Sequence, residues 1–231
     1  MADIATAGRI PLLVGGTMLY FHTLYAGMGG LPAVNPENRA MIEARLATEG
    51  PDALHAELAR LDPQSAARIM ANDHQRLIRA LELIATSGKT PSEHYAAQQR
   101  TVPPWQTLAI ALNPPRAALH ERIAARFRQM IAHGFIEEVA ALKARPHLGA
   151  DSPAMRSVGY RQIWQYLNGD CNHATAIEQG IIASRQLAKR QITWMNYGLR
   201  QVFDLHHYDP LQGPDAPLGA IADFINKKPL P

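Results

Sequence analysis

The turn at residues 15–17 has residue types that could hold a ligand. Gly15 and Gly16 permit positive φ and a close approach of the backbone. The Thr17 hydroxyl can cap the helix that follows, or it can face a ligand at the positive end of that helix. The residues alone therefore leave two interpretations open, a plain strand-to-helix turn and a ligand-binding turn.

A second candidate is a row of side chains that recurs at three- and four-residue steps along a predicted helix over residues 116–133: Arg122, Arg126, Gln129 and His133. Residues 105–200 carry 12 Lys and Arg against 6 Asp and Glu, and 10 of the 12 cations are arginines. Guanidinium groups bind phosphate through paired hydrogen bonds and stack on bases, so this segment favours a polyanionic partner. A merely solvated arginine face is the alternative.

The elements that must position these residues follow from the apolar pattern. Residues 10–14 predict a short buried strand that ends at the Gly-Gly-Thr turn, where α/β proteins keep their chemistry. Further strands are predicted over 105–112 and 202–205, with helices over 116–133, 172–198 and 218–226. Thr175 and Glu178 have capping-box spacing at the start of the long helix. A helical piece capped by residues 151–153 carries Gly159 between aromatic and arginine residues, which suggests backbone approach to a ligand.

Residues 31–104 are predicted to hold helices and loops only. Asn35 before Pro36 is a predicted N-cap, and Asp73 is another. The helix after Asp73 is predicted to bury a leucine-rich stripe and to leave Gln75, Arg79 and Glu82 together on its outer face. This block therefore interrupts an α/β chain with a separate helical domain.

Gly88-Lys89-Thr90 matches the end of a phosphate-binding P-loop, but the pattern predicts a helix stop instead. The P-loop motif requires a glycine at position 83, where Leu83 stands, and a strand rather than a helix before it. Gly88 suits the left-handed position after a helix, and Pro91 prevents the helix from continuing.

Composition excludes several classes of protein. One cysteine in 231 residues excludes an intramolecular disulfide framework and a cysteine-based zinc site, which favours a reducing, cytoplasmic compartment. No apolar run has transmembrane length, and the first residues lack the features of a secretion signal. Residues 1–7 have the pattern of a last helical turn before Gly8, so we expect the chain to begin inside a domain. No pattern of His, Cys, Asp and Glu predicts a metal site in this chain.

Four segments together carry a family resemblance. They are residues 12–20 (Leu-Leu-Val-Gly-Gly-Thr-Met-Leu-Tyr), 72–82 around Gln-Arg-Leu-Ile-Arg-Ala-Leu-Glu, 156–162 (Arg-Ser-Val-Gly-Tyr-Arg-Gln) and 186–194 (Gln-Leu-Ala-Lys-Arg-Gln-Ile-Thr-Trp). In this order they resemble the successive signatures of the bacterial tRNA dimethylallyltransferases, the tRNA isopentenyltransferase family. The resemblance extends over nearly the whole chain.

The resemblance implies a mostly helical α/β protein, with a P-loop-kinase-like core and an all-helical insertion domain. The implied domains are a core strand-turn-helix (1–30), the insertion (31–104) and a helix-rich core (105–231). The implied reaction transfers a dimethylallyl group from dimethylallyl diphosphate to the exocyclic amine of the adenosine 3′ to the anticodon, releasing diphosphate. The implied partners are tRNA, held by its anticodon stem-loop, and dimethylallyl diphosphate, with Mg²⁺ as cofactor. No membrane is involved, and the complete protein would be a cytoplasmic monomer.

By the same resemblance, Arg126 and Thr17 belong to the catalytic site, where Arg126 holds the diphosphate and Thr17 lies near the target nucleotide. The implied tRNA-binding residues are Thr17, Arg39, Gln75, Arg76, Leu77, Ile78, Arg79, Arg156, Ser157, Val158, Gly159, Tyr160, Arg161, Lys189, Arg190, Gln191, Ile192, Thr193, Trp194, Met195 and Asn196.

The family's opening strand, its Gly-Pro-Thr-Ala-Ser-Gly-Lys-Thr loop and the aspartate that serves as general base have no counterpart in this sequence. We therefore expect a core truncated at the N-terminus, with impaired activity of this chain alone. The alternative is a non-catalytic RNA-binding remnant of the same family. A helical DNA-binding protein would require a compact helix-turn-helix pattern, which the sequence lacks.

Overall fold

The computed structural model describes residues 1–27, 31–97 and 105–227, which form two compact units. The core unit comprises residues 1–21 and 105–231, and the helical unit comprises residues 22–104. The boundary between them falls inside α2 (Met18–Ala26).

The helical unit consists of α3 (Pro36–Glu49), α4 (Pro51–Leu61), α5 (Pro63–Ala66), α6 (His74–Ser87) and α7 (Pro91–Ala96). Its core gathers around Leu54, Leu58 and Leu77, whose side chains are completely buried. The side chain of Asn35 caps α3 by accepting hydrogen bonds from the Glu37 and Asn38 amides, as predicted. The short connections and the proline at the first position of α3, α4, α5 and α7 follow the usual chemistry of helix starts.

The Gly88-Lys89-Thr90 segment joins two helices, which confirms the predicted helix stop. Gly88 ends α6 in the left-handed conformation at φ 68°, and its amide donates to the Ile84 carbonyl. Thr90 then begins α7 in a capping box with Glu93. The segment therefore has no phosphate-loop geometry.

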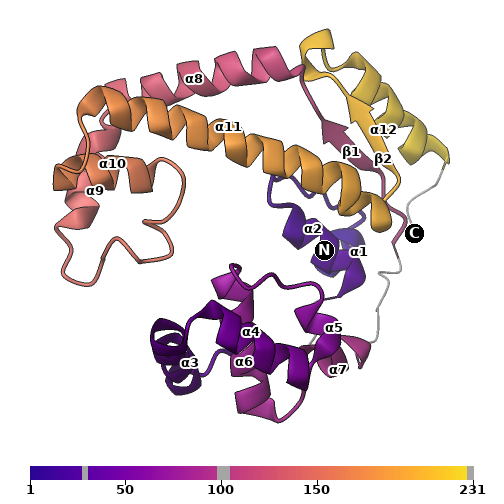
Figure 1. Cartoon of the computed structure of the whole chain (residues 1–231). Helices are drawn as coiled ribbons and strands as arrows, with labels where there is room; N and C mark the ends of the chain where they lie inside the picture. The colour runs from indigo at the N-terminus through magenta and orange to yellow at the C-terminus, as the bar shows by residue number, and fades with distance from the viewer. Residues whose placement is uncertain (28–30, 98–104, 228–231) are drawn as a thin grey trace. The chain divides into compact units, whose positions relative to one another are not determined.

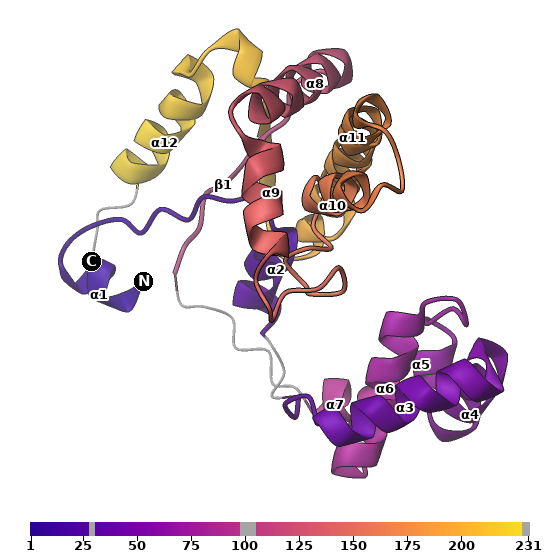
Figure 2. The ribbon, with the colours of Figure 1, turned by 90° about the vertical axis from the view of Figure 1, so that its left-hand side faces the viewer.

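The core unit has a two-stranded parallel sheet, in which β1 (Ala109–Leu112) pairs with β2 (Leu205–Tyr208) and Ala109 lies opposite Leu205. Between these strands run α8 (Arg116–Ala132), α9 (Phe135–Lys143), α10 (Tyr160–Asn168), α11 (His173–Tyr197) and η1 (Leu199–Gln201). The unit also contains α1 (Ala2–Thr6), η2 (Pro210–Gln212) and α12 (Asp215–Lys227). The helices α8 and α11 lie side by side, and α10 packs beside α11 (Figures 1 and 2).

Two apolar clusters hold the core unit together. The larger one lies among α8, α9, α10 and α11 and includes Phe127, Phe135 and Trp164. Phe127 packs against the backbone of α11 at Gly180, where an added Cβ would lie 2.1 Å from the ring. The smaller cluster joins β1 to the end of α11 and the start of α2 through Ala111 and Met195, together with Met18, Phe21 and their neighbours.

Several predicted elements are wrong. Residues 10–14 form no strand: Val14 is 86% exposed, and both described strands pair only with each other, so this run has neither a ladder partner nor a buried face. The helical piece predicted from 151 begins only at Tyr160, after a series of turns. The last strand occupies Leu205–Tyr208 rather than 202–205. Thr175 and Glu178 do not cap α11, because the Asn172 side chain accepts from the Thr175 amide in that role.

Candidate functional site

The Gly-Gly-Thr turn is attached to the last third of α11. The Gln191 side-chain Nε2 donates to the Gly16 carbonyl at 2.8 Å, across 175 positions of sequence. A Cβ on Gly16 would lie 3.1 Å from that nitrogen, so the close approach that glycine permits here serves a protein side chain. Two of the segments singled out in the sequence, 12–20 and 186–194, therefore meet at one place.

Packing behind the turn fixes this arrangement. Met18 and Phe21 contact the cluster of Ala111, Met195 and Leu199, which holds the first turn of α2 against the end of α11. Thr17 remains exposed on the outside of the turn. On α11 the side chains of Lys189, Arg190, Thr193 and Trp194 are exposed as well. The structure thus brings Thr17 near a basic, partly aromatic stretch of helix surface.

The predicted polar row on α8 faces solvent. Arg122, Arg126, Gln129 and His133 are all exposed, whereas Ala124 and Phe127 on the other side of the helix are buried. Within the described ranges all five ion pairs lie in the helical unit, so Arg122 and Arg126 have no carboxylate partner there. The core unit therefore presents uncompensated arginine charge, which is the electrostatic condition for binding a polyanion.

Arg126 on α8 and Thr17 before α2 lie near different parts of α11. The neighbour of Arg126, Phe127, touches α11 at Gly180, whereas the turn is attached at Gln191. These two points are separated by about three helical turns, or ~16 Å along the helix axis. The arginine row and the Gly-Gly-Thr turn are consequently two patches on one scaffold rather than one cluster.

Gly159 has a packing role in this structure, and its contact with a ligand stays a prediction. Its φ is +96°, and the position that a Cβ would take lies 3.3 Å from the Phe135 ring and 3.6 Å from Phe127. The adjacent Tyr160 stacks edge-on against Phe135, and its hydroxyl donates to Glu138, a hydrogen bond that raises the Tyr160 pKa. The flanking side chains of Arg156, Ser157 and Arg161 are exposed and Val158 is partly so.

The helical unit divides its predicted RNA-binding residues into exposed and buried ones. Gln75 and Arg76 are exposed on the first turn of α6, whereas Leu77 and Ile78 belong to the core, where their side chains support the helix. Arg39 is partly exposed and pairs with Glu43 at 2.9 Å. The predicted outer face of Gln75, Arg79 and Glu82 is wrong in one member, because Glu82 is completely buried.

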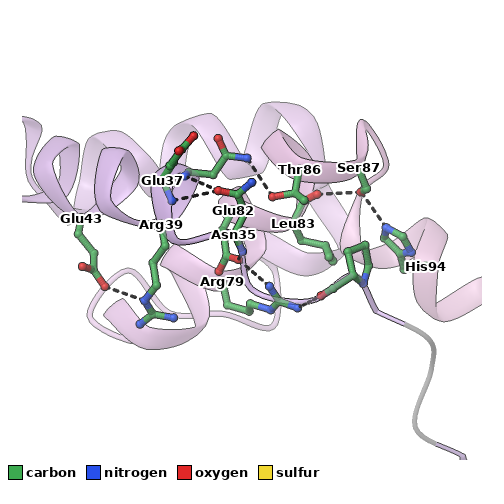
Figure 3. Close-up of polar contacts among 12 residues, drawn as sticks. Asn35, Glu37, Arg39, Glu43, Arg79, Glu82, Leu83, Thr86, Ser87 and His94 are labelled. Atoms are coloured by element: carbon green, nitrogen blue, oxygen red, sulfur yellow. Dashed lines mark hydrogen bonds and ion pairs between the residues drawn. The ribbon is translucent and has the colours of Figure 1, made fainter. Parts of the chain in front are cut away.

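Figure 3 shows what the sequence analysis missed around Glu82. Its carboxylate accepts hydrogen bonds from the Arg79 guanidinium and from the backbone N–H of Asn35, which is 47 residues away in the sequence. The only local signal was the three-residue spacing of Arg79 and Glu82, which equally suits an exposed ion pair.

Metal ligation finds no support in the described parts of the chain. No group of three or more His, Cys, Asp and Glu side chains is close enough there to hold a metal ion. None of the described helices is long and apolar enough to cross a membrane.

Comparison with known proteins gives one consistent family. The family model described as IPP transferase matches residues 1–198. The tRNA dimethylallyltransferase of Dichelobacter nodosus is 50% identical over 94% of this chain and 69% of its own length, and that of Thioalkalivibrio sulfidiphilus is 50% identical over 91% and 66%. The chain thus spans about two thirds of the length of these relatives.

Solved structures of transferases with similar names also resemble this chain. The tRNA isopentenylpyrophosphate transferase of Bacillus halodurans is 31% identical, with a TM-score of 0.60, over 98% of this chain and 69% of that protein. A eukaryotic dimethylallyltransferase described as acting on tRNA is 25% identical, with a TM-score of 0.76, over 99% of this chain and 60% of that protein.

Proposed function

Because the chain belongs to the IPP transferase family, we propose that it takes part in tRNA modification by transfer of a dimethylallyl group, in a core whose phosphate loop lies outside these residues. The donor is dimethylallyl diphosphate, and the acceptor is the exocyclic amine of the adenosine 3′ to the anticodon. The amine nitrogen forms a bond to the allylic carbon, the bond from that carbon to the diphosphate oxygen breaks, and the amine loses a proton. Mg²⁺ would act by shielding the diphosphate charge.

The observation that carries the proposal is the hydrogen bond from Gln191 to Gly16, which joins the Gly-Gly-Thr turn to the basic end of α11. A base that reacts must leave its stack and be held by its backbone while its amine is aligned. We assign the binding of the nucleotide backbone to Lys189, Arg190 and Thr17, all of them exposed. We assign diphosphate binding to Arg126, whose guanidinium has no carboxylate partner among the described residues.

A second function has its own support. Gly88-Lys89-Thr90 joins two helices, and we assign neither a phosphate loop nor the general base to a residue of this chain. A diphosphate needs a nest of backbone amides with a lysine to neutralise its charge. The helix-to-helix connection at residues 88–90 therefore favours an RNA-binding protein that, as the chain stands, carries out no transfer. The same observation fits the proposal that the P-loop part of the core lies outside these residues.

RNA binding tests what the two functions share. The chain should bind an anticodon stem-loop with an affinity that falls steeply as salt rises. Replacing Arg190 by Ala should reduce the slope of log affinity against log salt by about 0.7 to 0.9, the value for one lost phosphate contact. Arg145, exposed and without an ion pair in the described core unit, provides the matched control, and Arg145→Ala should leave the slope unchanged. A folded chain that binds with no salt dependence contradicts the proposal.

Transfer distinguishes the two functions. The chain should be incubated with labelled dimethylallyl diphosphate, Mg²⁺ and tRNA, with a full-length relative as the positive control. We expect no measurable transfer by this chain. Turnover near that of the relative would show that the catalytic groups do lie within these 231 residues.

A further inference from the structure

The helical unit contains a completely buried carboxylate, that of Glu82 on α6. Its Oε1 accepts two hydrogen bonds, from the Arg79 Nη1 at 2.8 Å and from the backbone nitrogen of Asn35 at 2.9 Å (Figure 3). Its Oε2 is buried without a hydrogen-bond partner in the described structure. Burial of a charge is costly unless the charge is paired, so both donors are necessary to this arrangement.

Arg79 completes a bridge between two segments. Its Nη2 donates to the Pro32 carbonyl at 2.6 Å, while its Nη1 binds Glu82. Asn35 has two roles here: its backbone N–H donates to Glu82, and its side chain caps α3. Through these bonds residues 32–35, which directly precede α3, are fixed to the side of α6.

Arg76, one turn earlier on α6, is in a different situation. Its side chain is 73% exposed, and among the described residues its guanidinium pairs only with Asp73, the N-cap of the same helix. An exposed ion pair of this kind is weak, so its guanidinium is available to a phosphate. The side chain of Arg79 is 29% exposed, and both of its terminal nitrogens donate within the protein.

We propose that Arg79 and Glu82 form a positioning pair, which fixes residues 32–35 against α6 and so sets how Gln75 and Arg76 are presented to RNA. The proposal rests on the proposed function, because it takes RNA as the ligand of α6. In this assignment Arg79 does not bind phosphate. Arg76 does, and the pair acts through it.

Binding of an anticodon stem-loop, measured across a salt series, separates the two arginines. Arg76→Ala should weaken binding and reduce the salt slope by about 0.7 to 0.9. Arg79→Lys should weaken binding about threefold to tenfold with the slope unchanged, because a lysine keeps the charge but cannot bridge Glu82 and Pro32. Retained affinity in Arg79→Lys overturns the proposal, because it would show that binding does not need the bridge between Glu82 and Pro32. A loss of slope in Arg79→Ala equal to that in Arg76→Ala also overturns it.

Glu82→Gln provides the second measurement and keeps a side chain of the same shape. If the pair positions Arg76, then Arg76→Ala should cost less affinity in the Glu82→Gln background than in the wild type. Arg190→Ala, in the core unit, should cost the same in both backgrounds. A lowered melting temperature with unchanged affinity at a temperature where the variant is folded would make the pair merely structural.

The outcomes distinguish a failure of the proposed function from a failure of this inference. If the folded wild-type chain does not bind the stem-loop, the proposed function and this inference fail together. If the wild type binds and Arg190→Ala reduces the slope, but the Arg76 and Glu82 effects are additive, only the inference fails.

Discussion

Replacing Gly180 by alanine should destabilise the core unit, because α8 and α11 meet there without space for a methyl group. The added Cβ would lie 2.1 Å from the Phe127 Cζ and 2.7 Å from both Cε atoms, whereas carbon atoms pack at about 3.5 to 4.0 Å. The ring cannot move aside freely, since it is 4% exposed and packs edge-on against Phe135. Overpacking of this kind costs about 1 to 3 kcal/mol, and alanine recovers up to about 1 kcal/mol of helix propensity.

The net change therefore lies between about 0 and 3 kcal/mol, and a loss of about 1 to 2 kcal/mol, in the middle of this range, lowers the melting temperature by about 2 to 8 °C. All three tryptophans, Trp105, Trp164 and Trp194, lie in the core unit, so tryptophan fluorescence during urea or thermal unfolding reports on that unit alone. Gly219→Ala in α12 is the matched control, because a Cβ there meets nothing within 4 Å. That substitution should be neutral or stabilising. Equal stability of the Gly180 and Gly219 variants would refute the packing argument.

Three further predictions concern single side chains. Gln191→Ala removes the bond to Gly16, so we expect weaker stem-loop binding with little change in the melting temperature; unchanged binding would separate the turn from the RNA site. Arg126→Ala, introduced into a full-length relative at the matching position, should lower transfer strongly and leave tRNA binding nearly intact; unchanged transfer removes Arg126 from the diphosphate site. Burial opposes ionisation of Asp62, but hydrogen bonds from Ser92 and Ser65 outweigh it and lower the Asp62 pKa. The stability from this ionised carboxylate is present above the unfolded pKa of about 3.9 and is lost as the pH falls through the folded value, so the stability gap between wild type and Asp62→Asn should shrink in acid.

Features that depend on a few neighbouring residues could be predicted from the sequence. The caps at Asn35 and Asp73 and the left-handed Gly88 all follow from side chains or backbone freedom within three or four positions. The exposed row on α8 follows from helical periodicity, because the opposite face supplies Phe127 to the core. The site residues themselves could be named only through the family resemblance.

Features that depend on distant partners could not be predicted. The buried position of Glu82 depends on the backbone N–H of Asn35 and on Arg79, which also donates to the Pro32 carbonyl. No local sequence pattern indicates either contact. Gly159 gives the same local signal whether its free side faces a ligand or the rings of Phe127 and Phe135. Residues 10–14 have the composition of a buried strand, but a strand also needs a neighbour with which to exchange hydrogen bonds.

The parallel pairing of β1 with β2 sets the order in which the molecule can form. The α-helices α8 to α11 separate the two strands, so the sheet cannot form until α11 and β2 have been synthesised, and closing such a long connection is slow. The helical unit is one continuous stretch with mostly local contacts, and we expect it to fold first as the chain emerges from the ribosome. The Gly-Gly-Thr turn is synthesised before either, yet it needs Gln191 to hold it. Residues 15–17 are thus synthesised before most of both units, but they are among the last to reach their place.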